Sequence, residues 1–163
     1  MTRLINIIFP DSAGNQRFDI SLLSFRLLFG LLFMIHGLSK INDFGQMALT
    51  FPDPLGVGSE ISLILAIFGE VVCSAMLMLG LLTRLSLLPM MFTMCIAFFV
   101  IHAGAPFSAK ELSFIYLATF MIIWISGAGK YSLDYMIRGK LITSLNQNKK
   151  WIGYCCFLPD CSR

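Results

Sequence analysis

Hydrophobic residues along this chain gather into four long blocks, which polar or glycine-rich segments separate. A helix crosses the hydrocarbon core of a bilayer in roughly 20 residues, at a rise of about 1.5 Å per residue. The blocks match this length and predict transmembrane helices at residues 20–38, 61–82, 85–102 and 109–125. Only a short turn separates the second block from the third, so we expect these two helices to be antiparallel neighbours.

A different pattern follows the fourth block. Leu133, Ile137 and Leu141 recur at helical spacing, with basic residues between them. This amphipathic pattern is typical of a helix that lies in the membrane interface, and we expect such a helix within residues 128–145. The predicted fold class is therefore an all-α membrane protein, a four-transmembrane-helix bundle with a C-terminal amphipathic interfacial helix.

Composition supports this interpretation. Of 163 residues, 57% are hydrophobic and 13% are charged, whereas soluble domains average about 45–50% and roughly 25%. The net charge of +3 is small and its cations mostly flank the hydrophobic blocks, so we expect contact with membrane lipid and none with nucleic acid. The predicted organisation is an N-terminal segment at 1–18, the bundle at 19–127, the interfacial segment at 128–145 and a tail at 146–163.

The cations also predict an orientation. Lys40 and Lys110 fall on one side of the predicted bundle, and nine cations fall on the other: Arg3, Arg17, Arg84, Lys130, Arg138, Lys140, Lys149, Lys150 and Arg163. By the positive-inside rule the richer side is cytoplasmic. We therefore expect a multi-pass protein of the bacterial plasma (inner) membrane with both termini in the cytoplasm.

Three cysteines lie in the predicted tail, namely Cys155, Cys156 and Cys161. A reducing compartment disfavours a structural disulfide there. Their spacing also lacks the paired arrangement of structural zinc sites, so we predict no metal site and leave their role open.

Two charges fall inside the predicted spans. Arg26 lies roughly 10 Å into the first helix and Glu70 roughly 18 Å into the second, both counted from the predicted cytoplasmic end. Because unpaired charges in hydrocarbon cost several kcal/mol, we predict a structural ion pair between Arg26 and Glu70. The alternative is that Glu70 accepts a proton near a buried cavity.

The two histidines of the chain reach one predicted depth. His36 and His102 each lie roughly 26 Å from the cytoplasmic start of their helices. Lys40 follows His36 by one helical turn, and Glu111 lies near the start of the fourth helix. His36, Lys40, His102 and Glu111 are therefore the candidate polar site, near the outer leaflet.

That site has three interpretations. A quinone could accept hydrogen bonds from His and Lys while a carboxylate moves protons. Both histidines could instead ligate a haem, which we favour less than quinone. In the third, the histidines only face lipid headgroups and Glu111 belongs to a helix-capping box with Ser108.

Several short motifs occur in a fixed order and resemble those of one family. They are RLLFGLLFMIHGLSK at Arg26–Lys40, Glu70 followed by GLLTR at Gly80–Arg84, His102, Lys110-Glu111, and GAGKYSLD at Gly127–Asp134. In these features the chain resembles the DoxX family of small bacterial inner-membrane proteins, from about Phe18 to Asp134. The resemblance implies a four-helix membrane fold. It also implies a link to redox or maturation systems, since members are similar to subunits of thiosulfate:quinone oxidoreductases.

We therefore expect a membrane component of a redox system that engages quinone or a partner oxidoreductase. A non-catalytic membrane anchor or assembly factor for a partner protein is the alternative. A small transporter with Glu70 as its coupling group is a third hypothesis. Whether the chain is itself an enzyme stays open at this point.

Overall fold

The computed structural model describes residues 16–140, and within that range the protein is helical and has no strand. Four helical units are each long and apolar enough to cross a membrane. The first unit is α2 (Gln16–Asn42), and the second combines α4 (Ser59–Ile67), η1 (Phe68–Val72) and α5 (Cys73–Leu79). The third unit combines α6 (Thr83–Ile96) and η2 (Ala97–Ile101), and the fourth is α7 (Phe107–Ser126). The predicted four-helix membrane fold is confirmed.

Several expectations concern the ends of the chain. Residues 133–140 are helical and fall within the segment predicted to be interfacial. The tail with its three cysteines lies outside the described residues. The first helix extends beyond the predicted span at both ends, because polar residues near a membrane surface can continue a helix that hydrophobicity alone would end.

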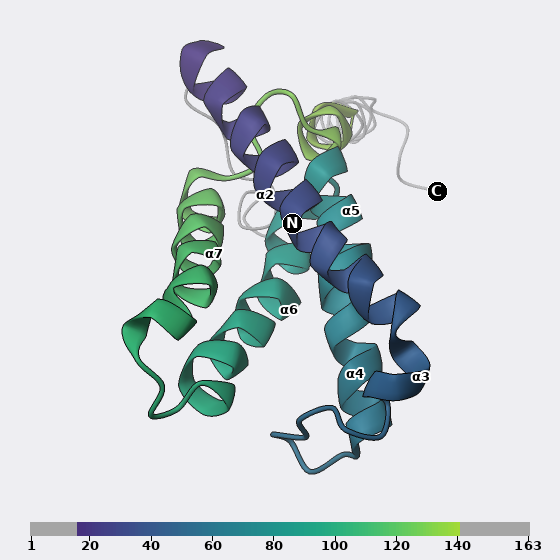
Figure 1. Cartoon of the computed structure of the whole chain (residues 1–163). Helices are drawn as coiled ribbons and strands as arrows, with labels where there is room; N and C mark the ends of the chain where they lie inside the picture. The colour runs from purple at the N-terminus through teal and green to yellow at the C-terminus, as the bar shows by residue number, and fades with distance from the viewer. Residues whose placement is uncertain (1–15, 141–163) are drawn as a thin grey trace, which may run out of the picture.

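The four crossings give the bundle two different ends (Figure 1). We call one the turn end: it holds the start of α2, the tight turn at residues 80–82 and the helix at 133–140. We call the other the loop end: it holds the short helix α3 (Phe44–Met47), the long loop at 48–58 and the connection at 102–106. The predicted orientation would place the turn end in the cytoplasm.

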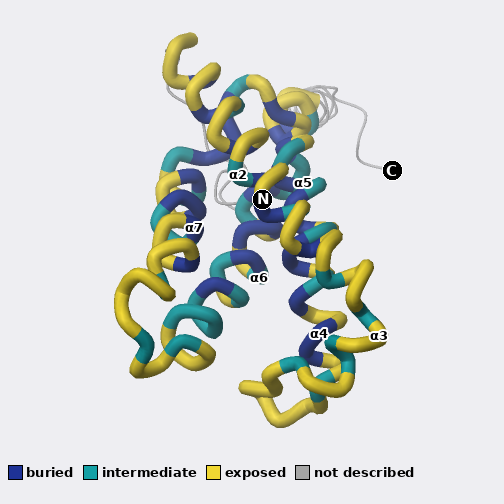
Figure 2. Tube along the Cα trace, in the orientation of Figure 1, coloured by how far each residue is buried: buried dark blue, intermediate teal, exposed yellow. Residues whose placement is uncertain are grey.

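Buried residues face the axis of the bundle, and exposed ones face outward (Figure 2). The core cluster comprises Phe33, Cys73, Leu77, Leu87, Met90, Met94, Tyr116, Phe120 and Ile123. Large apolar side chains such as Phe99 and Ile122 are more than half exposed. An outer surface this apolar would be costly in water but suits hydrocarbon. The structure is thus that of a multi-pass membrane protein whose outer face contacts lipid.

Arg26 stabilises the turn end and does not pair with Glu70, so the predicted ion pair is wrong. Arg26 is 1% exposed. It donates to the backbone carbonyls of Leu77 at 3.0 Å and Met78 at 3.1 Å, and to that of Ala128. The carbonyls of Leu77 and Met78 belong to the last turn of α5, where backbone carbonyls have no hydrogen-bond partner within the helix. These carbonyls carry partial negative charge and therefore attract a cation. Side chains tilt toward the N-terminus of their helix, so Arg26 points to the turn end and away from Glu70.

Two carboxylates complete the turn end. Asp134 accepts hydrogen bonds from the backbone N–H groups of Leu82 at 2.6 Å and Thr83 at 2.8 Å, at the start of α6. Asp19 accepts one from the backbone N–H of Lys130 at 3.2 Å, and the ammonium of Lys130 lies 3.8 Å from its other oxygen. Polar contacts thus tie α2, α6 and the segment after α7 together at this end.

Candidate functional site

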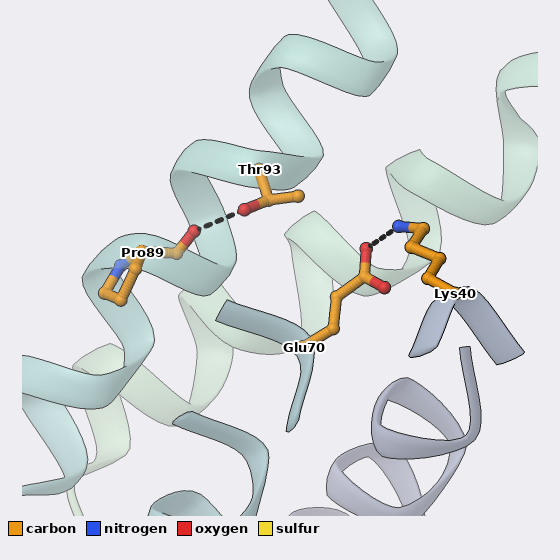
Figure 3. A network of polar contacts seen from close by, with 4 residues as sticks. All are labelled: Lys40, Glu70, Pro89 and Thr93. Atoms are coloured by element: carbon orange, nitrogen blue, oxygen red, sulfur yellow. Dashed lines mark hydrogen bonds and ion pairs between the residues drawn. The ribbon is translucent and has the colours of Figure 1, made fainter. Parts of the chain in front are cut away.

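Glu70 forms a buried ion pair with Lys40 near the middle of the bundle (Figure 3). The carboxylate lies about 16 Å from the start of its helical unit, at a rise of about 1.5 Å per residue. The second unit runs from the loop end to the turn end, so the tilt of side chains points Glu70 toward the loop end. α2 runs the opposite way, so the same rule points Lys40 back toward Glu70. The geometry of two antiparallel helices therefore selects this partner.

One oxygen of Glu70 remains available. Lys40 donates to Oε1. The other oxygen, Oε2, is buried, and within residues 16–140 no protein group hydrogen-bonds it. Such an acceptor in a side chain only 2% exposed is costly unless a ligand, a proton or water satisfies it. The pair is therefore chemically incomplete.

A glycine and a π-helix place Glu70 at this position. A Cβ atom on Gly37 would lie 2.6 Å from Cγ2 of Val71 and 2.8 Å from Cβ of Glu70, so only glycine lets α2 approach this closely. Glu70 itself lies in η1, a π-helix. π-Helical segments are rare in proteins, and those that occur are often found at functional sites.

An apolar cavity of about 300 Å³ lies between the second and third helical units, beside the loop at 48–58. Of the residues between 16 and 140 that line it, Lys40 and Glu70 are the charged ones. Thr93, whose hydroxyl donates to the carbonyl of Pro89 at 2.9 Å, adds a satisfied polar group (Figure 3). Both π-helices contribute to its wall. The remaining lining residues are Phe51, Pro52, Pro54, Leu55, Ser62, Leu65, Ala66, Phe68, Pro89, Phe92, Met94, Ile96, Ala97 and Ile101.

A second cavity of about 400 Å³ lies on the other side of the ion pair, between α2 and α7. Its lining is more polar than that of the first cavity, and we call it the polar cavity. Lys40, Glu70 and Met94 line both cavities. The other residues of the polar cavity are Phe33, His36, Ser39, Asp43, Met47, Leu112, Ser113 and Tyr116. The ion pair thus separates an apolar pocket from a polar one.

The structure divides the four predicted site residues into two groups. His36 and Lys40 line the polar cavity with Glu70. His102 and Glu111 line neither cavity. Nδ1 of His102 lies 2.7 Å from the carbonyl of Ala97 in its own helix, and Glu111 is exposed. Of the four predicted residues, the two cavities thus bring together His36 and Lys40, and they add the deeper carboxylate of Glu70.

The start of α7 tests whether Glu111 takes part in a capping box with Ser108. The helix begins at Phe107 after an N-cap at Pro106, with no side-chain cap. The capping box between Ser108 and Glu111 is therefore not formed.

Sequence reasoning missed the contribution of α7 to the site. Tyr116 is buried, and its ring meets that of His36 edge-on with 6.0 Å between ring centroids. Ser113 lies one turn away and lines the same cavity. Two polar residues three apart in an apolar helix could have indicated this inward face.

Comparisons with known proteins agree with the motifs. The DoxX family model matches residues 21–103. An uncharacterized protein of Haemophilus influenzae is 29% identical over 143 residues, which cover 83% of this chain and 91% of that one. A Bacillus subtilis protein named "Putative oxidoreductase CatD" is 27% identical over 128 residues, which cover 77% of this chain and 94% of that one. No solved structure matches the chain.

Proposed function

The chain belongs to the DoxX family, and we propose that it is a membrane component of a redox system that binds quinone at the Lys40–Glu70 pair. The observation that carries this proposal is the position of the pair, a buried and incompletely satisfied carboxylate at the boundary between an apolar and a polar cavity. The name of the Bacillus subtilis relative supports a redox role.

A quinone has an apolar part that suits the apolar cavity and polar oxygens that suit the Lys40–Glu70 pair. Its ring and isoprenoid tail are apolar and suit the cavity between the second and third helical units. Its carbonyl oxygens need hydrogen-bond donors, which the Lys40 ammonium provides. The reduced form carries hydroxyl groups, which can donate to Oε2 of Glu70. Small-molecule sites typically combine an apolar wall with a few polar groups in this way.

The division of labour follows from that chemistry. Reduction of a quinone to a quinol takes up two electrons and two protons. In this proposal Lys40 orients the ring, and Glu70 holds and transfers protons. A partner oxidoreductase supplies or accepts the electrons. We place the protein in the bacterial plasma membrane with both termini in the cytoplasm, which puts the site nearer the outer leaflet.

Binding of a short-chain quinone to the purified protein in nanodiscs tests the proposal. Glu70→Gln and Lys40→Met each remove one charge-assisted contact, worth about 1.5–3 kcal/mol, and should weaken binding roughly 10- to 100-fold. Glu60→Gln is the matched control, because Glu60 is an exposed acid at the start of the same helical unit. His102→Ala and Glu111→Gln should also bind normally.

Other outcomes decide against the proposal. Wild-type affinity in both Glu70→Gln and Lys40→Met, with helicity retained, would contradict a quinone site at the pair. If a pathway that needs this protein also kept full activity with both variants, the anchor hypothesis would be favoured instead.

A further inference from the structure

We propose that Glu70 exchanges protons with water at the loop end only, through the polar cavity, and that the turn half of the bundle is closed to protons. The role given to this proton exchange rests on the proposed function, because the reduction or oxidation of a quinone takes up or releases protons. The test of the exchange itself does not depend on quinone.

Polar groups lead from the surface of the loop end to Glu70. His36 and Lys40 are four residues apart and lie on one face of α2. Asp43 follows Lys40 by three residues, directly after the end of α2, and continues that face. Asp43 is exposed, Lys40 is partly buried and Glu70 is buried. Ser113 from α7 lines the same cavity, which is roomy enough for several water molecules.

Within residues 16–140, the turn half of the bundle shows no comparable series of polar groups between Glu70 and the surface. On that side of Glu70 the axis of the bundle is filled by apolar side chains, and Leu77, Leu87 and Phe120 are each 0% exposed. The hydroxyl of Thr119 donates to the carbonyl of Ile115 at 2.8 Å, and that of Ser86 donates to the carbonyl of Thr83 at 3.0 Å. Within residues 16–140 the buried hydroxyls of Ser74 and Thr83 have no hydrogen-bond partner. The charged group on this side is the buried Arg26, which backbone carbonyls hold at the end of α5. Hydroxyl groups that fully buried apolar side chains keep apart do not form a continuous chain of titratable groups.

The other neighbours of Glu70 provide no exit either. Among the described residues that line the apolar cavity, the titratable groups are Lys40 and Glu70 themselves. On α7 the titratable group that lines the polar cavity is Tyr116, which is buried. His36 and Asp43, both exposed, therefore lie on the side from which protons enter or leave.

The consequence for the reaction is directional. When a quinone is reduced, the partner oxidoreductase supplies two electrons and loop-end water supplies two protons through Glu70. When a quinol is oxidised, two electrons leave to the partner and two protons are released at the loop end. In the predicted orientation that side is outside the cell.

Labelling by dicyclohexylcarbodiimide tests this inference. The reagent dissolves in the membrane and converts a protonated carboxyl group to a stable N-acylurea, so its rate follows the protonated fraction of Glu70. The full chain is reconstituted into vesicles, its orientation is assigned by protease access to a tag, and pH is set separately on the two sides. Mass spectrometry then reads the label on the peptide that contains Glu70.

Labelling of Glu70 should follow the pH at the loop end, falling about tenfold per pH unit where the group is mostly ionised, and should ignore the pH at the turn end. Glu70→Gln should lose this label, and Glu60→Gln should keep it. Labelling that follows the turn end, or both sides equally, would overturn the inference, as would no labelling at any pH. Quinone binding by the same preparations is measured separately, so either idea can fail alone.

Discussion

Replacing Lys40 by Met and Glu70 by Gln, singly and together, should reveal strong coupling between these two residues. The Lys40→Met variant leaves a carboxylate that is 2% exposed without its cation. The Glu70→Gln variant leaves an ammonium that is 23% exposed and can turn toward water. The two single variants should therefore differ in their cost, and the double variant, which leaves no buried charge unpaired, should cost less than their sum.

The expected magnitudes follow from burial. Removing one partner of a buried pair costs about 3–5 kcal/mol, and the partial exposure of Lys40 puts the loss for Lys40→Met near the lower value. Glu70→Gln should cost about 1–2 kcal/mol, because the amide can still accept a hydrogen bond. A coupling energy of about 2 kcal/mol is then expected, within the usual range for contacting residues.

Equilibrium unfolding in mixed micelles, followed by far-ultraviolet circular dichroism, measures each free energy of unfolding. The same cycle with Arg26→Met and Glu70→Gln is the control, because Arg26 binds backbone carbonyls and not Glu70. The two Arg26 and Glu70 changes should therefore be additive. Additivity for Lys40 and Glu70, or coupling for Arg26 and Glu70, would refute the geometry from which the site is built.

Three further changes have defined outcomes. Gly37→Ala should push α2 away from η1 and lower the free energy of unfolding by about 1–3 kcal/mol, with loss of quinone binding, because its Cβ would lie 2.8 Å from that of Glu70; an unchanged stability would contradict this. Asp134→Ala should cost about 1–2 kcal/mol by removing the cap of α6, measured by the same unfolding assay. In the loop at 48–58, the backbone N–H of Gly58, 2.7 Å away, lowers the pKa of Asp53 below its ordinary value. The ionised Asp53 side chain therefore stabilises the loop above about pH 3.9, and this contribution is lost as pH falls through the pKa of the folded protein. The protection factor of the Gly58 amide, which is its intrinsic exchange rate divided by its measured rate, should be higher at neutral pH than in acid; equal protection factors would refute this.

The fold was predictable from the sequence because it depends on the length and hydrophobicity of whole segments and not on single residues. Blocks of roughly 20 apolar residues have few alternatives to a membrane helix, and the short gap between the second and third blocks predicts a hairpin. The structure places its turn at residues 80–82, directly before α6 begins at Thr83. The π-helices were not predictable, because a shift of one hydrogen bond leaves no mark in the hydrophobic pattern.

The site was predictable only in part. Counting depth identified His36 and Lys40 as neighbours of a polar site, and it also identified Glu70 as a costly charge. It gave Glu70 the wrong partner because depth along a helix ignores the direction in which side chains tilt. His102 has the right depth, but it contacts the carbonyl of Ala97 in its own helix, and depth carries no information about the direction in which a side chain faces.

Photo-crosslinking with a quinone analogue tests the central claim most directly. The analogue is irradiated with the protein in nanodiscs, and labelled residues are mapped by mass spectrometry. Crosslinks should fall on the walls of the apolar cavity, on peptides that contain Leu65, Phe68 or Phe92. Unlabelled quinone should displace them, and Glu70→Gln should lose most of them. Displaceable labelling confined to the turn end, or labelling of the cavity that Glu70→Gln leaves intact, would contradict a quinone site at the Lys40–Glu70 pair.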